Sequence, residues 1–165
     1  PVEQEGTYPL PEAQQDRFMM KLVIKYPKKA EEKIIMERNT SNDKLEDVKI
    51  NPVVSKSEIK EIKSIIRNIY IDDKLKDYIL DIVYKTREES EYILCGASPR
   101  ATVNIAMAAK GKAFLEGRGY VLPDDIKSVV YDVLRHRIML SYEAEAEGKK
   151  TEDIIMEILE NINLP

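Results

Sequence analysis

The sequence predicts a mainly α-helical protein, a helical bundle preceded by a short loop and strand of α/β character. Two observations carry this prediction. Apolar residues recur at helical spacing through most of the chain after Pro27. Helix-start signals precede several of these runs, and the clearest is the capping box formed by Ser55 and Glu58.

The amino-terminal segment has a different pattern. Residues 17–27, "RFMMKLVIKYP", alternate between apolar positions on one side and mixed positions on the other, which predicts a half-buried strand. The sequence offers no comparable set of strands to pair with it, so we expect its partners outside this chain. We therefore divide the chain into residues 1–26, a remnant of an α/β core, and residues 27–165, a helical domain.

Within the helical domain, the predicted elements follow from cap residues and periodicity. We expect helices that begin near these residues: Pro27, Ser55, Asp72, Ser98, Pro123 and Thr151. The helices after Ser55 and Asp72 should pack together through their isoleucines. A short strand is expected near residues 138–142, where apolar residues alternate again.

Composition excludes several classes of function. The chain has 165 residues, with 26 Lys and Arg against 30 Asp and Glu, so no net positive field favours nucleic acid. No apolar run approaches the roughly 20 residues that cross a bilayer. The single cysteine, Cys95, is expected to be a small buried residue in a cytoplasmic, reducing setting, and no metal site is predicted. Because the chain begins at Pro1 without an initiator Met, we expect it to be part of a longer protein.

Two arginines are candidates for chemistry. Arg100 falls in the first turn of the helix capped by Ser98, where free N–H groups and the helix dipole favour an anion. Arg17 lies at a loop-to-strand junction, from which it could reach a neighbouring molecule. The plainer alternatives are a surface arginine at a well-made helix start for Arg100, and a local pair with Asp16 or Glu12 for Arg17.

Other features point away from an autonomous enzyme. His136 is the only histidine, and a packed or surface role fits it best. No G-x-x-x-x-G-K-[ST] phosphate-binding loop is present; "AAKGKAF" lacks its spacing and its Ser or Thr. This chain alone should therefore not hold a nucleotide tightly.

Three long stretches resemble the carboxy-terminal portion of MoxR-type AAA+ ATPases. They are "VEQEGTYPLPEAQQDRFMMK" at 2–21, "GASPRATVNIAMAAKGKAFLEGRGYVLPDDIK" at 96–127 and "VLRHRIMLSYEAEAEG" at 133–148. They occur in the order and with the spacing of that family. The resemblance implies that residues 1–26 end an AAA+ core and that residues 27–165 form its helical lid domain.

The resemblance also implies roles for residues. Arg17 matches the arginine finger that completes the ATP site of an adjacent subunit. Arg100 matches the sensor 2 arginine that contacts the γ-phosphate, and Ser98 belongs to the same motif. The Walker motifs lie upstream in such proteins, so ATP and Mg²⁺ are expected only in the intact parent.

The parent would be an ATPase that forms a ring, expected to be a hexamer, and that remodels or matures unknown partner proteins like a chaperone. The alternative is a free-standing helical adaptor that binds a protein and has no ATPase activity. Nucleic-acid binding through "KGK" and "RHR" is disfavoured by the acidic balance of the chain.

Overall fold

The computed structural model describes residues 10–40 and 50–165 of the chain. Its residues fall into two compact units. The larger contains the described part of Pro1–Lys21 together with Ser64–Pro165, and the smaller contains the described part of Leu22–Lys63. The domain boundary expected between residues 26 and 27 stays a prediction, because compactness does not test which family domain a residue belongs to.

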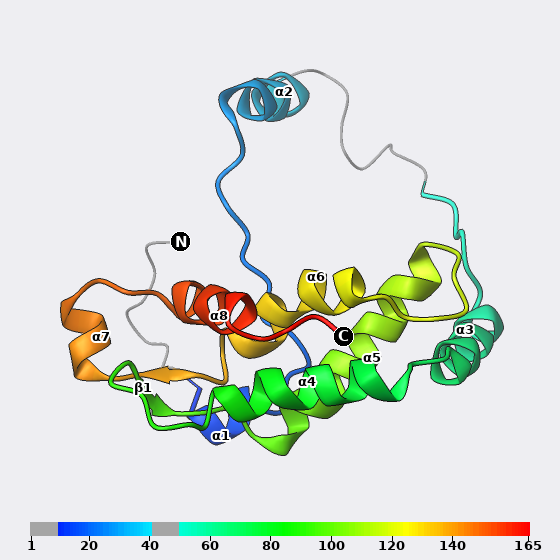
Figure 1. Cartoon of the computed structure of the whole chain (residues 1–165). Coiled ribbons are helices and arrows are strands. Elements are labelled where there is room, and N and C mark those ends of the chain that lie inside the picture. The colour runs from blue at the N-terminus through cyan, green and yellow to red at the C-terminus, as the bar shows by residue number, and fades with distance from the viewer. Residues whose placement is uncertain (1–9, 41–49) are drawn as a thin grey trace. The chain divides into compact units, whose positions relative to one another are not determined.

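The larger unit is a helical bundle with a two-stranded ribbon, as Figure 1 shows. Its helices are α1 (Glu12–Gln15), α4 (Asp73–Lys85), α5 (Pro99–Leu115), α6 (Pro123–Leu134), α7 (Tyr142–Ala146) and α8 (Thr151–Glu160). Strands β1 (Ile93–Cys95) and β2 (Met139–Leu140) pair antiparallel. The predicted mainly α-helical fold is confirmed.

The core of this unit lies largely between α5 and α6. Small residues on α5 allow the two helices to approach closely, since alanine presents little bulk at the contact. The residues buried on these facing helices include Ala101, Ile105, Ala109 and Ala113 on α5, and Ile126, Val130, Val133 and Leu134 on α6. The helical spacing of apolar residues expected after Pro27 is confirmed on both helices.

The smaller unit holds α2 (Lys29–Thr40), and α3 (Lys56–Asn68) begins in it. The predicted capping box is present at the start of α3: the Ser55 amide donates to the Glu58 carboxylate at 2.7 Å, and the Glu58 amide donates to Ser55 Oγ at 3.2 Å. No residue of α3 is buried, although Ile69, which directly follows it, is 4% exposed and belongs to the same core as the buried residues of α4. Because α3 runs from one compact unit into the other, its expected packing against α4 stays a prediction.

The strand expected over residues 17–27 is absent from the structure. Residues 20–28 have no regular secondary structure, although the Lys21 amide donates to the Asp132 carbonyl at 2.8 Å. A strand is stable only when a neighbouring strand pairs its amides and carbonyls, and the described residues provide none here. The short strand expected near residues 138–142 is present as β2, but β1 and α7 were not predicted.

The loop between β1 and α5 is fixed to the end of α4. The buried Thr86 hydroxyl donates to the Val83 carbonyl at 2.7 Å and accepts from the Ala97 amide at 3.0 Å. The Arg87 side chain also donates to the Ala97 carbonyl, at 2.7 Å. A Cβ added at Gly96 would lie 2.2 Å from the Thr86 carbonyl oxygen. Only glycine fits this approach, which fixes where α5 begins.

Gly96→Ala should lower the free energy of unfolding by about 1 to 3 kcal/mol, because the new methyl group forces two backbone segments apart. Chemical denaturation of the two proteins measures the difference. Gly111→Ala is the matched control: it lies inside α5 with no atom within 4 Å of an added Cβ. That control should leave stability unchanged or raise it by about 0.5 to 1 kcal/mol. Equal effects at both glycines would contradict the close approach at Gly96.

Candidate functional site

Four polar side chains from distant parts of the chain meet in the larger unit. We call them the Asp16 cluster: Asp16, Ser98, Arg100 and Arg137. Asp16 follows α1, Ser98 and Arg100 begin α5, and Arg137 follows α6. The cluster joins the segment that carries Arg17 to the helix that carries Arg100.

The start of α5 binds the Asp16 carboxylate. Ser98 is the N-cap residue: its Oγ accepts from the Arg100 amide at 3.3 Å and lies 3.0 Å from both carboxylate oxygens of Asp16, to which it donates. The Arg100 guanidinium reaches the same carboxylate at 2.5 Å. A hydroxyl, a guanidinium and the positive end of a helix thus converge on one anion.

Arg137 is the buried member of the cluster. Its side chain has no exposed surface, and its Nε donates to the Asp16 carboxylate at 3.0 Å. The rest of the guanidinium donates to backbone carbonyls: those of Asp16 at 2.9 Å, Phe18 at 2.5 Å and Met19 at 3.2 Å, and that of Val133. One arginine therefore satisfies four carbonyls and a carboxylate, and it fixes residues 16–19 against the end of α6.

The electrostatics of the cluster keep Asp16 ionised. Burial alone raises the pKa of this carboxyl, but hydrogen bonds from Ser98, Arg137 and Arg100 outweigh burial and hold the pKa below its ordinary value. Next to the cluster, burial lowers the pKa of His136, although a ring nitrogen of this residue lies 3.1 Å from the Phe18 carbonyl. A neutral His136 therefore packs beside the cluster, which agrees with the packed role expected for it.

Arg17 directly follows Asp16, so the cluster positions its backbone. Its side chain is exposed, and within the described part of the chain no ion pair holds it. The local pair with Asp16 or Glu12, considered as the plainer alternative, is not formed, since Asp16 binds Arg100 and Arg137 instead. Arg17 is thus free to contact a group from outside this chain.

The structure brings two of the three predicted site residues, Ser98 and Arg100, together on the Asp16 carboxylate, a residue that the sequence did not single out as functional. The third, Arg17, directly follows Asp16 in the chain, but its side chain does not join them. Asp16 was considered only as a partner for Arg17, and Arg137 was noted only as part of the "RHR" cluster. A usable signal was present, because Arg137 stands between the buried Leu134 and Ile138. A charge among buried residues indicates a specific partner.

The two basic clusters considered for nucleic acid are occupied by other contacts. In "RHR", Arg135 is paired with Asp132 at 3.0 Å and Glu152 at 3.1 Å, and Arg137 is buried. In "KGK", Lys112 is paired with Glu116 at 2.5 Å and Lys110 donates to a backbone carbonyl at 2.9 Å. Neither cluster presents a set of unpaired cations.

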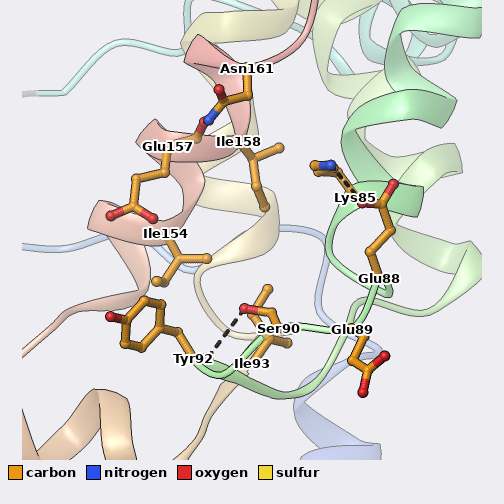
Figure 2. Close-up of a pocket in the computed structure, with 10 residues that line it drawn as sticks. All are labelled: Lys85, Glu88, Glu89, Ser90, Tyr92, Ile93, Ile154, Glu157, Ile158 and Asn161. Carbon is orange, nitrogen blue, oxygen red and sulfur yellow. Dashed lines mark hydrogen bonds and ion pairs between the residues drawn. The ribbon is translucent and has the colours of Figure 1, made fainter.

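A separate pocket of about 200 Å³ lies between the end of α4, the segment before β1, and α8. Figure 2 shows Tyr92 and Ile93 on one side and Ile154 and Ile158 of α8 near them. Three glutamates line the pocket, and its single lining lysine, Lys85, is already paired with Glu88 at 2.5 Å. Its negative charge does not suit a phosphate ligand.

Three further features concern Cys95, metal ions and membranes. Cys95, the last residue of β1, is exposed, so the expectation of a buried cysteine is wrong. In the described ranges, no group of three or more His, Cys, Asp or Glu side chains could hold a metal ion. None of the helices described is long and apolar enough to cross a membrane.

Comparison with known proteins gives this geometry a family context. Residues 85–158 match the AAA lid domain. Over its whole length the chain is 41% identical to the Bacillus subtilis protein YeaC and 36% identical to "Chaperone MoxR1" of Mycobacterium tuberculosis, covering 51% and 45% of those proteins. The chain spans about half the length of the curated relatives it matches.

A solved structure agrees with these relatives. The crystal structure of a "putative ATPase" from Cytophaga hutchinsonii matches the whole chain with a TM-score of 0.87 and 46% identity, over 52% of its own length. The lid-domain match and this fold place the protein in the AAA+ class. Within that class, the chain belongs to the MoxR type, as its sequence had indicated.

Arg137→Met should lower the free energy of unfolding by about 2 to 4 kcal/mol, because it leaves the Asp16 carboxylate and several carbonyls without their buried donor. It should also speed hydrogen exchange at the Lys21 amide, which depends on the docking of this segment on α6. Denaturation and exchange mass spectrometry measure both effects. Arg17→Ala removes an exposed arginine from the same segment and should change stability by no more than about 0.5 kcal/mol. Slow exchange at Lys21 in Arg137→Met would contradict the docking role.

Asp16→Asn should be less stable than the wild-type chain at pH 7 by about 1 to 3 kcal/mol, since a charged acceptor is replaced by a neutral one. The pKa of Asp16 is lowered in the folded protein, so its stabilising effect is complete above the ordinary Asp pKa of about 4 and is lost as pH falls below that value. Urea denaturation between pH 7 and pH 2 should show the two proteins converge in acid. A difference that stays constant over this range would argue against an ionised Asp16 as the cause.

Proposed function

We propose that this chain forms the lid-side part of a MoxR-type AAA+ ATPase and contributes two arginines to ATP hydrolysis. Arg17 acts as the arginine finger on the ATP of an adjacent subunit. Arg100 acts as sensor 2 and contacts the γ-phosphate, with Ser98 organising the same helix start. The chain supplies these groups but not the Walker motifs.

The observation that carries the proposal is the convergence of donors on the Asp16 carboxylate. The Ser98 hydroxyl and the Arg100 guanidinium already bind one oxyanion at the start of α5. A phosphate oxygen has the same charge sign and accepts the same donors. Arg17 follows Asp16 directly, and its exposed guanidinium is available to a second molecule.

The mechanism follows from the charge of phosphoryl transfer. Negative charge spreads over the γ-phosphoryl oxygens as the bond to the leaving oxygen breaks, and a guanidinium placed against them stabilises that state. Mg²⁺ supplies further neutralisation of the phosphates when ATP is bound. We propose that ligands for Mg²⁺ and for the adenosine belong to the Walker motifs, which the resemblance places upstream of this chain.

We also propose partners for the whole protein. We propose a homo-oligomeric ring, as an arginine finger acting on a neighbour requires, with a hexamer as the expected size. One relative is named a chaperone, and this supports remodelling or maturation of other proteins as the task of the ring. We place the protein in the cytoplasm.

A free-standing protein-binding adaptor is the second candidate. The exposure of two isoleucines of α3, Ile59 and Ile65, each 45% exposed, favours it. Reading the gene upstream of Pro1 separates the two: an in-frame Walker A motif supports the ATPase, and its absence supports the adaptor.

In the full-length protein, Arg17→Ala and Arg100→Ala should each lower the rate of ATP hydrolysis at least tenfold, and loss of a finger can reach roughly 10³- to 10⁵-fold. The reason is the loss of positive charge at the γ-phosphate. Steady-state turnover at saturating ATP measures the effect. Arg67→Ala, which removes another exposed arginine, is the matched control and should retain wild-type turnover. Wild-type rates in Arg17→Ala and Arg100→Ala would remove both assigned roles.

A further inference from the structure

The Asp16 carboxylate lies between two arginines, one buried and one half-exposed. Arg137 binds it from inside the protein, with no exposed side-chain surface. Arg100 binds it from outside, with 49% of its side chain exposed. The carboxylate itself is 21% exposed, so solvent or a ligand can reach the Arg100 side of the pair.

The two contacts differ in how readily they can break. The Arg137 guanidinium is also bound to the carbonyls of Asp16, Phe18, Met19 and Val133, so its release would leave several buried groups unpaired. The Arg100 guanidinium is bound, among the described residues, to the Asp16 carboxylate only. A half-exposed ion pair of this kind contributes little and exchanges partners at low cost.

We propose that Asp16 is a positioning residue, a resident anion that holds Arg100 until a terminal phosphate of ATP replaces it. This inference rests on the proposed function of Arg100. A triphosphate offers more negative charge than a single carboxylate, so the exchange favours the nucleotide. Ser98 and Arg137 keep their contacts with Asp16 throughout, and the segment stays docked.

The exchange links the two arginines of one chain. While Arg100 binds Asp16, three donors hold the residue that directly precedes Arg17. When phosphate takes Arg100, two donors remain and the backbone at Arg17 is less constrained. Contact between Arg100 and a phosphate therefore alters how firmly the same chain presents Arg17 to its neighbour.

Competition by Asp16 also sets how well the protein distinguishes nucleotides. A nucleotide with a γ-phosphate must displace Asp16 from Arg100 and gives up part of its binding free energy to do so. ADP does not reach Arg100 and displaces nothing. Removing the charge of Asp16 should therefore tighten the binding of ATP analogues and leave the affinity for ADP unchanged.

The test measures dissociation constants of Mg-ATPγS and Mg-ADP by titration calorimetry with the full-length protein. Asp16→Asn should bind ATPγS about threefold to tenfold more tightly than wild type, as expected for loss of one charged competitor. Its ADP affinity should be unchanged. Asp16→Glu restores the charge and should restore wild-type discrimination, which a purely structural role does not predict.

The double variant shows whether Asp16→Asn changes ATPγS affinity through Arg100. Arg100→Ala should weaken ATPγS binding, and adding Asp16→Asn to it should change nothing further, because the two residues act through one contact. A gain that persists in the double variant overturns the proposal. The proposal is also overturned if Arg100→Ala binds ATPγS more weakly than wild type but Asp16→Asn binds it with the same affinity as wild type. If Arg100→Ala itself binds ATPγS normally, the proposed function of Arg100 fails instead.

A measurement on the wild-type protein covers the case in which Asp16→Asn does not fold. Structures of the full-length protein with Mg-ADP and with Mg-ATPγS should show the Arg100–Asp16 pair closed in the first and open in the second. The Arg137–Asp16 contact should be closed in both. A closed Arg100–Asp16 pair with ATPγS bound overturns the proposal.

Discussion

The contact between Arg137 and Asp16 is the constraint on which the site depends. A guanidinium with no exposed surface must bind its acceptors well, since burying an unpaired charge costs several kcal/mol. Arg137 meets this requirement only when residues 16–19 lie against the end of α6. The hydrogen bonds that the buried Arg137 requires therefore dock this segment, which has no regular secondary structure beyond the single turn of α1.

A second set of contacts fixes the start of α5, which carries the rest of the site. The buried Thr86 hydroxyl and the close approach at Gly96 determine where α5 starts, and therefore where Ser98 and Arg100 lie. The packing of α5 against α6 then connects the Arg137–Asp16 contact, at the end of α6, with the Thr86 and Gly96 contacts that fix the start of α5. Arg17 and Arg100 lie in distant parts of the chain, yet the Asp16 carboxylate joins the segment that carries Arg17 to the helix that carries Arg100.

Local signals were sufficient for most helices because caps and periodicity act over a few residues. Ser98 with Pro99 marks the start of α5, and Asp72 caps α4 as expected. The strand expected over residues 17–27 does not form in the described chain, because a strand is stable only when a neighbouring strand pairs with it and its partners were expected outside this chain. The expected burial of Cys95 was wrong: it is exposed at the end of β1, although Ile93 two residues earlier is part-buried, so residue type and alternation alone do not predict its exposure. The three-residue β1 and the five-residue α7 were not predicted from the sequence.

By itself the sequence determined the helical class of the protein, its resemblance to MoxR-type ATPases, and Arg17, Ser98 and Arg100 as candidates. Each of these rests on residues close together in the chain. Only the tertiary structure decided that Asp16 and Arg137 support those candidates, because their contacts join residues 121 positions apart and Asp16 and Arg100 are 84 apart. Hydrogen bonding between such distant residues leaves no periodic trace in one sequence; it follows from how the helices pack.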